Sequence, residues 1–189
     1  MYYLRITIDG ITPPIWRLIK IPETFSLNKL HHIIQIAFGW ENKYIYCFRH
    51  DEVPTTNPIL WGGGVTIYDK RVKIKDVLQQ VGDTLPYEYD IADGWKHTIV
   101  LENIKSGLSK WAQCPDGARA APPEDFGGVR RYQEIIYHLC HPEIDGYLEL
   151  LDLLGDNYDS EQFDQELANK RLRELGQYIK AYDEKHGLW

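Results

Sequence analysis

The spacing of apolar residues changes along the chain, and this change constrains the fold more than any other feature. Apolar and polar residues alternate over residues 4–9, and residues 15–21 continue an extended pattern, which predicts two strands, the first with one buried face. From residue 27 to 38 the apolar residues recur at helical spacing, which predicts an amphipathic helix capped by Ser26 and ended by Gly39. Further strand and turn patterns over 43–101, with a short helix over 74–81, indicate a mostly antiparallel sheet.

The second half of the chain has different patterns. Residues 105–128 show no apolar periodicity and contain several prolines and glycines, which predicts a long functional loop. Helical spacing then predicts helices over 129–139, 147–154 and 161–182, the last capped by Asp159 or Ser160. We therefore expect a single α+β domain over 1–189. Its sheet-rich part (1–104) is a mostly antiparallel twisted sheet with one amphipathic helix, and its helical part (129–182) covers that sheet.

The composition limits the class of protein. With 43% hydrophobic residues among 189, the chain is typical of soluble globular proteins, and it has neither an apolar run long enough for a membrane span nor the pattern of a signal peptide. The three scattered cysteines, Cys47, Cys114 and Cys140, indicate reduced thiols and so a cytosolic protein. A net charge of −7 argues against general nucleic-acid binding, because phosphate contacts need clustered basic residues.

Four segments in a fixed order resemble one protein family, the plasmid pRiA4b ORF-3-like family. They are PPIWR with LHHIIQIAFGW (13–17, 30–40), YEYDIADGWKH (87–97), CPDGARAAPPEDFGGVRRY (114–132) and FDQELANKRL (163–172). The resemblance implies an α+β domain associated with mobile elements and without an established activity. This chain departs from the family pattern at Tyr44 and Tyr46, which replace a His-x-His pair, at Ala92, which replaces a glycine, and at Phe126, which replaces a cysteine.

Residues 89–97 have the highest density of polar groups. Tyr89, Asp90, Asp93, Trp95 and His97 lie on a predicted strand–turn–strand unit, where Asp93 and His97 could converge to transfer a proton or to share a metal. The alternative is that Asp93 and Gly94 only form the hairpin turn, while Trp95 belongs to the core.

The predicted loop contains four further candidates, namely Cys114, Arg119, Glu124 and Asp125. Its two carboxylates could act as a base or hold a divalent cation, and its arginine could bind an anion. The alternative is a structural role, with an ion pair between Arg119 and Asp125, or Asp125 as the cap of the next helix. The N-terminus of that helix could instead receive an anion beside Arg119, Arg130 and Arg131.

Two candidates lie on the first predicted helix. His31 and Gln35 share one face, beside the apolar stripe, and could line a groove with Trp16 and Trp40. The alternative is a half-buried histidine bound to a backbone carbonyl. No Cys or His residues have the spacing of a zinc site, and no phosphate-binding or nucleophile motif occurs, so no cofactor is predicted.

Together these patterns favour a cytosolic, non-catalytic binding domain whose partner is a protein or a small anionic ligand, without a role at membranes. The alternative is a metal-assisted hydrolase acting on a phosphoester, with Asp93, His97, Glu124 and Asp125 as ligands or bases. That alternative requires the four side chains to meet at one cavity.

Overall fold

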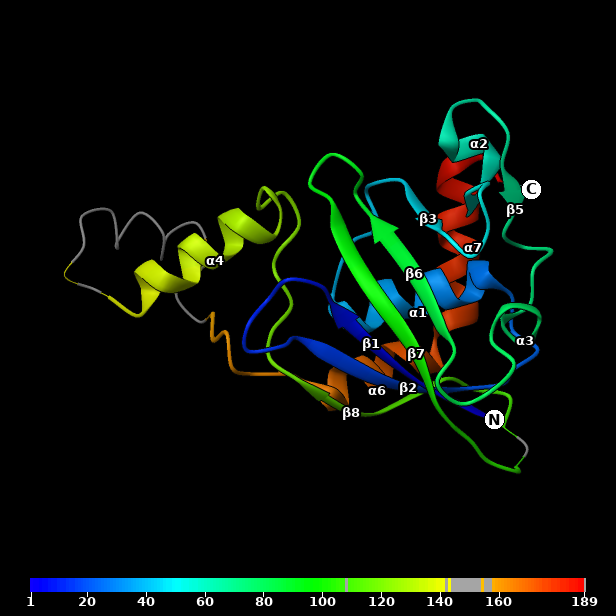
Figure 1. The fold of residues 1–189 in the computed structure, drawn as a ribbon, viewed down its shortest axis with the longest axis horizontal. Coiled ribbons are helices and arrows are strands. Elements are labelled where there is room, and N and C mark those ends of the chain that lie inside the picture. The colour runs from blue at the N-terminus through cyan, green and yellow to red at the C-terminus, as the bar shows by residue number, and fades with distance from the viewer. Residues whose placement is uncertain (108, 142, 144–153, 155–157, 189) are drawn as a thin grey trace.

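The computed structural model describes residues 1–107, 109–141, 143, 154 and 158–188, and it contains one eight-stranded sheet (Figure 1). The strand order is β5-β4-β3-β6-β7-β1-β2-β8, and every neighbouring pair is antiparallel except β4 and β5. The strands are β1 (Tyr2–Ile8), β2 (Trp16–Ile21), β3 (Tyr46–Phe48), β4 (Thr55–Thr56), β5 (Ile67–Tyr68), β6 (Thr84–Tyr89), β7 (Trp95–Ile104) and β8 (Gln113–Ala118).

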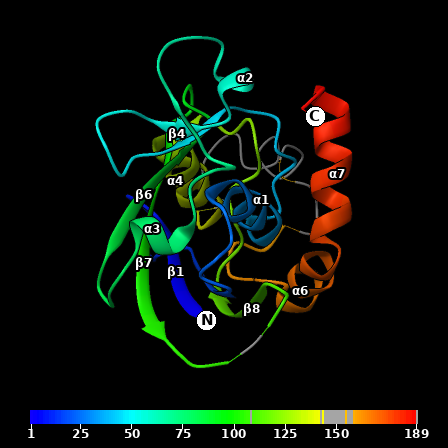
Figure 2. The same ribbon diagram turned by 90° about the vertical axis from the view of Figure 1, so that its right-hand side faces the viewer.

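The longer helices lie against this sheet and beside it. The described helices are α1 (Leu27–Phe38), α2 (Pro58–Trp61), α3 (Ile74–Val77), α4 (Gly128–Leu139), α6 (Gln165–Arg173) and α7 (Leu175–His186). Figure 2 shows α1 between the sheet and the layer formed by α6 and α7, and α1 contacts both of these helices. Strands dominate the N-terminal part and helices the C-terminal part, so the predicted single α+β domain with a mostly antiparallel sheet is confirmed.

Helix α1 has the predicted ends but not the predicted surroundings. The Ser26 hydroxyl accepts a hydrogen bond from the Lys29 backbone N–H at 3.3 Å, and Gly39 ends the helix at φ 78°. Every residue of α1 except Lys29 is buried. The amphipathic pattern predicted one buried face, but the second helical layer covers the other face as well.

The predicted loop over 105–128 contains a strand, which corrects that prediction. Strand β8 pairs with β2 at the edge of the sheet, with Gly117 opposite Arg17 and Ala118 opposite Trp16. Its sequence, QCPDGA, has no alternation of apolar residues and includes Pro115, which edge strands tolerate. The periodicity rule therefore fails here.

Arg17 joins β2, α1 and β8 although it lies on the buried face of its strand. Its Nε donates to the carbonyl of Ala37 at the end of α1 (2.9 Å), and its Nη1 donates to the carbonyls of Trp16 (2.8 Å) and Ala118 (2.9 Å). The guanidinium stacks on Phe163 at 3.8 Å. Burial lowers its pKa to about 10, and the cation stabilises the carbonyl end of α1.

The predicted C-terminal helices differ in detail. The helix predicted over 161–182 consists of two helices, because the chain turns at Glu174 and α6 and α7 take separate directions. Asp164, rather than Asp159 or Ser160, caps α6, with its carboxylate accepting from the Leu167 N–H at 2.8 Å.

The other predicted helices differ less from the structure. Helix α4 matches its prediction and α3 ends earlier than predicted. The helix predicted over 147–154 falls outside the described residues except for Leu154. Within the described part of the chain, no helix is long and apolar enough to cross a membrane.

Candidate functional site

The predicted hairpin and loop do meet, in a region that we call the hairpin–loop corner (residues 41–44, 89–94 and 124–128). Glu124 lies at its centre with a side chain only 6% exposed. One carboxylate oxygen accepts from the Glu41 N–H at 2.8 Å, and the other accepts from the Tyr89 hydroxyl and from the Lys43 N–H at 3.5 Å. Burial and this carboxylate raise the pKa of Tyr89. Glu124 therefore holds three segments together.

Asp125 and Arg119 have partners other than the predicted ones. Asp125 accepts a hydrogen bond from the Tyr44 hydroxyl, which raises the pKa of Tyr44 to about 12, and it lies 3.7 Å from the Lys43 Nζ. Arg119 pairs with Glu161 at 2.7 Å. The predicted ion pair between Arg119 and Asp125 is wrong, because the chain returns after α4 and places Glu161 closer.

The N-terminus of α4 already holds a carboxylate from the hairpin. Asp93 accepts a hydrogen bond from the Gly127 N–H at 2.8 Å, so the predicted capping role of Asp125 is also wrong. Gly128 has φ 77°, and a Cβ on it would lie 2.3 Å from the Asp93 carbonyl oxygen. The paired glycines thus permit close contact between two backbones, and a second anion at this N-terminus would meet Asp93.

The other hairpin candidates are part of the folded framework. Asp90 is 5% exposed and accepts from the Ala92 N–H at 3.2 Å and the Asp93 N–H at 3.3 Å, and burial raises its pKa. Trp95 and His97 are each 1% exposed. The His97 Nδ1 donates to the Trp95 carbonyl at 3.0 Å, its Nε2 has no partner among the described residues, and burial lowers its pKa to about 3.

His31 and Gln35 are fully buried in a chain of side-chain hydrogen bonds, which corrects their predicted half-exposed position. Gln35 donates to the Tyr87 hydroxyl at 3.1 Å, Tyr87 contacts the His31 Nδ1 at 2.8 Å, and the His31 Nε2 contacts the Asn42 Oδ1 at 2.9 Å. Because an amide oxygen only accepts, the His31 proton is on Nε2, and Nδ1 accepts from Tyr87. Burial keeps the pKa of His31 well below its ordinary value.

The predicted groove between the first helix and two tryptophans is also absent from the described structure. Trp40 is 6% exposed, its Nε1 donates to the Pro122 carbonyl at 2.8 Å, and its ring stacks on Phe38 and Tyr89. Trp16 is half-buried under the guanidinium of Arg5, 3.9 Å from the ring. The two tryptophans therefore belong to different parts of the framework.

The residues proposed for metal or nucleophilic chemistry do not form such a site. Within the described ranges, no three His, Cys, Asp or Glu side chains are placed to hold a metal ion. Asp93, Glu124 and Asp125 bind separate partners in the corner, while the His97 ring packs between aromatic rings in the core. Cys114 is fully buried and its pKa is raised to about 11, so its thiol remains protonated and a poor nucleophile.

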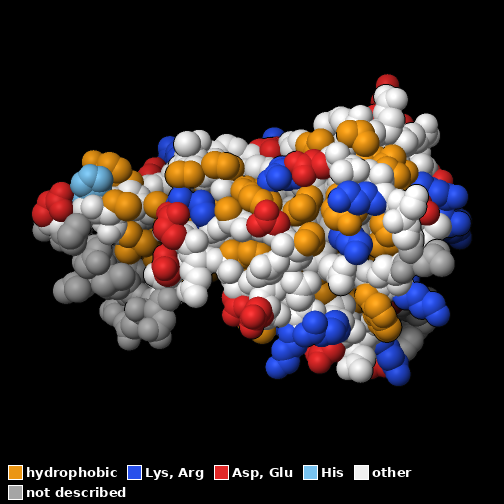
Figure 3. Space-filling view, turned by 90° about the horizontal axis from the view of Figure 1, so that it is seen from below, with side chains coloured by type: hydrophobic (Ala, Val, Ile, Leu, Met, Phe, Trp, Pro, Cys, Tyr) orange, Lys and Arg blue, Asp and Glu red, His pale blue; other side chains and the backbone are white. Residues whose placement is uncertain are grey.

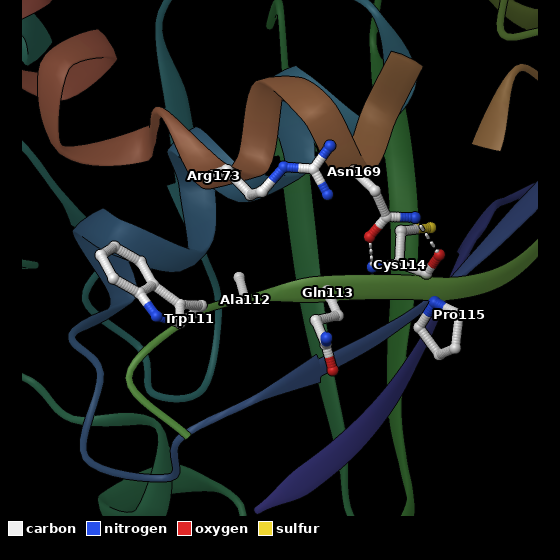
Figure 4. A pocket seen from close by; sticks show the side chains of 7 residues that line it. All are labelled: Trp111, Ala112, Gln113, Cys114, Pro115, Asn169 and Arg173. Carbon is white, nitrogen blue, oxygen red and sulfur yellow. Dashed lines mark hydrogen bonds between the residues drawn. The ribbon is translucent and has the colours of Figure 1, made fainter. Parts of the chain in front are cut away.

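A different surface has the features of a binding site, and we call it the Trp111 pocket. It is a hollow of about 490 Å³ between β8 and α6, lined by Trp111, Ala112, Gln113, Cys114, Pro115, Asn169 and Arg173 (Figure 4). The Trp111 side chain is 61% exposed, although Ala112 and Cys114 beside it are buried. The pocket thus has a rigid floor and an exposed aromatic wall.

Helix α6 forms the opposite wall of this pocket. The Asn169 side chain binds both backbone groups of Cys114, accepting from its N–H at 2.9 Å and donating to its carbonyl at 2.8 Å. Arg173 has no ion pair among the described residues, and Figure 4 shows its guanidinium above β8, near Asn169. The sequence did not predict Trp111 and Arg173 as site residues. The signal that could have found the pocket is Trp111 itself, a tryptophan in a segment without any periodic apolar face.

Comparison with known proteins places the chain in a family. The uncharacterized protein y4hQ of Sinorhizobium fredii (strain NBRC 101917 / NGR234) is 32% identical over 176 residues, covering 91% of this chain and 90% of that protein. The crystal structure of the protein of unknown function MM3350 from Methanosarcina mazei Go1 matches with a TM-score of 0.75 and 31% identity, over 87% of this chain and 95% of that one. The model of the plasmid pRiA4b ORF-3-like protein matches residues 1–167, and this chain therefore belongs to that family.

Proposed function

We propose that this protein is a non-catalytic, cytosolic binding domain and that the Trp111 pocket is its ligand site. The observation that carries the proposal is the exposure of Trp111 at the wall of a hollow of about 490 Å³, within the size range of small-molecule sites. A large aromatic ring in water is costly, whereas the same ring supplies much of the binding energy when a ligand covers it.

The hairpin–loop corner supports the same proposal by contrast. Its polar groups bind one another, and Glu124 and Asp90 are buried in those contacts. The buried thiol of Cys114 and the separated carboxylates offer no nucleophile or metal cluster in the described part of the chain. Binding is therefore the function that the geometry supports best.

The test uses the full chain labelled with ¹⁵N and two aromatic probes of one shape, 1-naphthoate and naphthalene-1-carboxamide. We expect at least one probe to shift the Trp111 indole N–H and Cys114 backbone N–H signals saturably. In Trp111→Ala, followed by the Cys114 N–H signal, we expect this binding to be lost. Val65→Ala, which truncates another exposed apolar side chain, is the control and should bind normally. If neither probe moves the Trp111 signal, or if Trp111→Ala binds as well as the natural chain, the proposal is wrong.

A further inference from the structure

Strand addition is blocked at the Trp111 pocket, although β8 is the edge strand of the sheet. The Cys114 N–H and carbonyl are bound by Asn169, and the Pro115 carbonyl accepts from the Gln165 Nε2 at a short distance. Pro115 itself has no N–H to offer. An extended peptide could not pair with this edge without displacing both amide side chains of α6, so the occupant must be held by side chains.

The side chains around the pocket have one sign of charge. Arg173 is the single charged residue among the described residues that line it, and no acidic side chain is present there. On the face shown in Figure 3, most of the visible Lys and Arg side chains lie away from the α4 end of the molecule. Arg173 is therefore the group in this lining that can contact an anion.

The two exposed groups lie at different places along the pocket, with the Trp111 ring at one end and the Arg173 guanidinium beside Asn169 (Figure 4). A tryptophan ring stacks on a flat partner, and a guanidinium offers a planar fork of N–H donors that matches the two oxygens of a carboxylate. The buried floor at Ala112 and Cys114 makes the space between them apolar. The two walls come from β8 and α6, and Asn169 fixes the distance between these elements.

From these observations we infer that the Trp111 pocket takes a small aromatic carboxylate, with the ring against Trp111 and the carboxylate on Arg173. This inference rests on the proposed function and adds the chemical class of the ligand.

The test compares three probes in the same experiment, with the Trp111 indole N–H as reporter. We expect 1-naphthoate to bind at least tenfold more tightly than the neutral naphthalene-1-carboxamide and than cyclohexanecarboxylate, which has the charge without the aromatic ring. Arg173→Gln should weaken 1-naphthoate about tenfold and leave the amide unchanged. Equal binding of naphthoate and amide would overturn the carboxylate class while the pocket remains a binding site, whereas binding of neither would overturn both proposals.

Two further variants separate recognition from folding. Arg173→Lys keeps a positive charge at the C-terminus of α6 but loses the planar fork, so 1-naphthoate should bind with intermediate affinity. Lys180→Gln removes an exposed basic residue from α7, 79% exposed and paired with Glu184, and should leave the affinity unchanged. If Lys180→Gln weakens binding as much as Arg173→Gln, the effect is one of net charge and the assigned contact with Arg173 is wrong.

Discussion

The hairpin–loop corner and the Trp111 pocket use their polar and aromatic side chains in opposite ways. In the corner, Glu124 is buried and accepts from three donors, whereas at the pocket Trp111 is 61% exposed and Arg173 has no ion pair among the described residues. In this protein, the segments richest in carboxylates and tyrosines therefore have a structural role, because their side chains bind one another. The candidate site lies where side chains are left without partners.

The corner needs such a framework because its backbone is unusual. Asn42, Asp90 and Asp125 have positive φ values of 61°, 50° and 68° without being glycine. Such conformations cost about 1–3 kcal/mol each and persist only where the surroundings hold them. The side-chain contacts of Glu124 and Asp93 with backbone N–H groups hold these segments in place. The pocket instead lies between a strand and a helix, which need no such bracing.

The largest expected effect concerns acid stability and originates in the core next to the corner. His31, His32 and His97 are buried and neutral, and burial lowers the pKa values of His32 and His97 to about 3. The unfolded chain takes up protons near pH 6.5, so stability is complete above that pH and falls as the pH decreases from 6.5 towards 3. At pH 5, His32 and His97 should each cost about 2 kcal/mol, about 4 kcal/mol together, and His31 adds to the loss in the same direction. Urea denaturation between pH 8 and 5 measures this loss.

His97→Phe tests the origin of that slope, because the ring fits the aromatic surroundings and does not titrate. Below pH 6.5, the unfolding free energy of His97→Phe should still fall with decreasing pH. Its slope should be smaller than that of the natural chain by about 1.4 kcal/mol per pH unit. Burial raises the pKa of Asp69, so this carboxyl makes stability rise as the pH falls, but its contribution is the same in His97→Phe and in the natural chain. An unchanged slope in His97→Phe would show that His97 is not held neutral in the folded state.

The next largest effect breaks the corner at its closest backbone contact. Gly128→Ala puts a Cβ 2.3 Å from the Asp93 carbonyl oxygen in a residue with φ 77°. Backbone strain and displacement of the hairpin should together cost about 3 kcal/mol or more of unfolding free energy. Thermal and urea denaturation measure the loss.

Gly176→Ala is the matched control, because nothing lies within 4 Å of the added Cβ and the residue is helical in α7. It should stabilise the protein by up to about 1 kcal/mol. If the two variants are equally stable, the contact between Asp93 and Gly128 is not formed in solution.

A smaller loss is expected from Glu124→Gln, which keeps the size of the side chain. The amide cannot accept from the Glu41 N–H and from the Tyr89 hydroxyl at once, so one donor is left without its partner. The cost should be about 1–2 kcal/mol of unfolding free energy. Glu52→Gln, in an exposed loop, is the control and should be neutral. A neutral Glu124→Gln would mean that Glu124 does not hold the corner together.

Most of the fold could be predicted from the sequence, because the burial of its main elements follows a simple period. The alternation before Ile8 and Ile21 identifies β1 and β2, and Ser26 with Gly39 marks the ends of α1. Strand β8 escaped because an edge strand that contains Pro115 and Gly117 has no apolar alternation. The bend at Glu174 escaped because both helices continue the same apolar spacing, and their separate directions depend on tertiary packing.

The candidate site was harder to predict because the partners of a polar side chain are long-range. Arg119 pairs with Glu161 and Glu124 binds the backbone of residue 41, and no local pattern encodes either contact. The hairpin and the loop do lie together, through Asp93 and Gly127, but the sequence could not show that their polar groups bind each other. Whether a polar side chain has a hydrogen-bond or ion-pair partner is decided by the tertiary structure.

The smallest expected effect on folding is at the pocket, and it sharpens the comparison most. Trp111→Ala and Arg173→Gln should each change the unfolding free energy by no more than about 0.5 kcal/mol, because both side chains are exposed. Trp40→Ala, a tryptophan of the framework that is 6% exposed and bound to Pro122, should cost about 3–5 kcal/mol. Urea denaturation of the three variants checks this. A loss above about 2 kcal/mol in Trp111→Ala would place Trp111 in the framework, because a side chain kept for a ligand contributes little to folding.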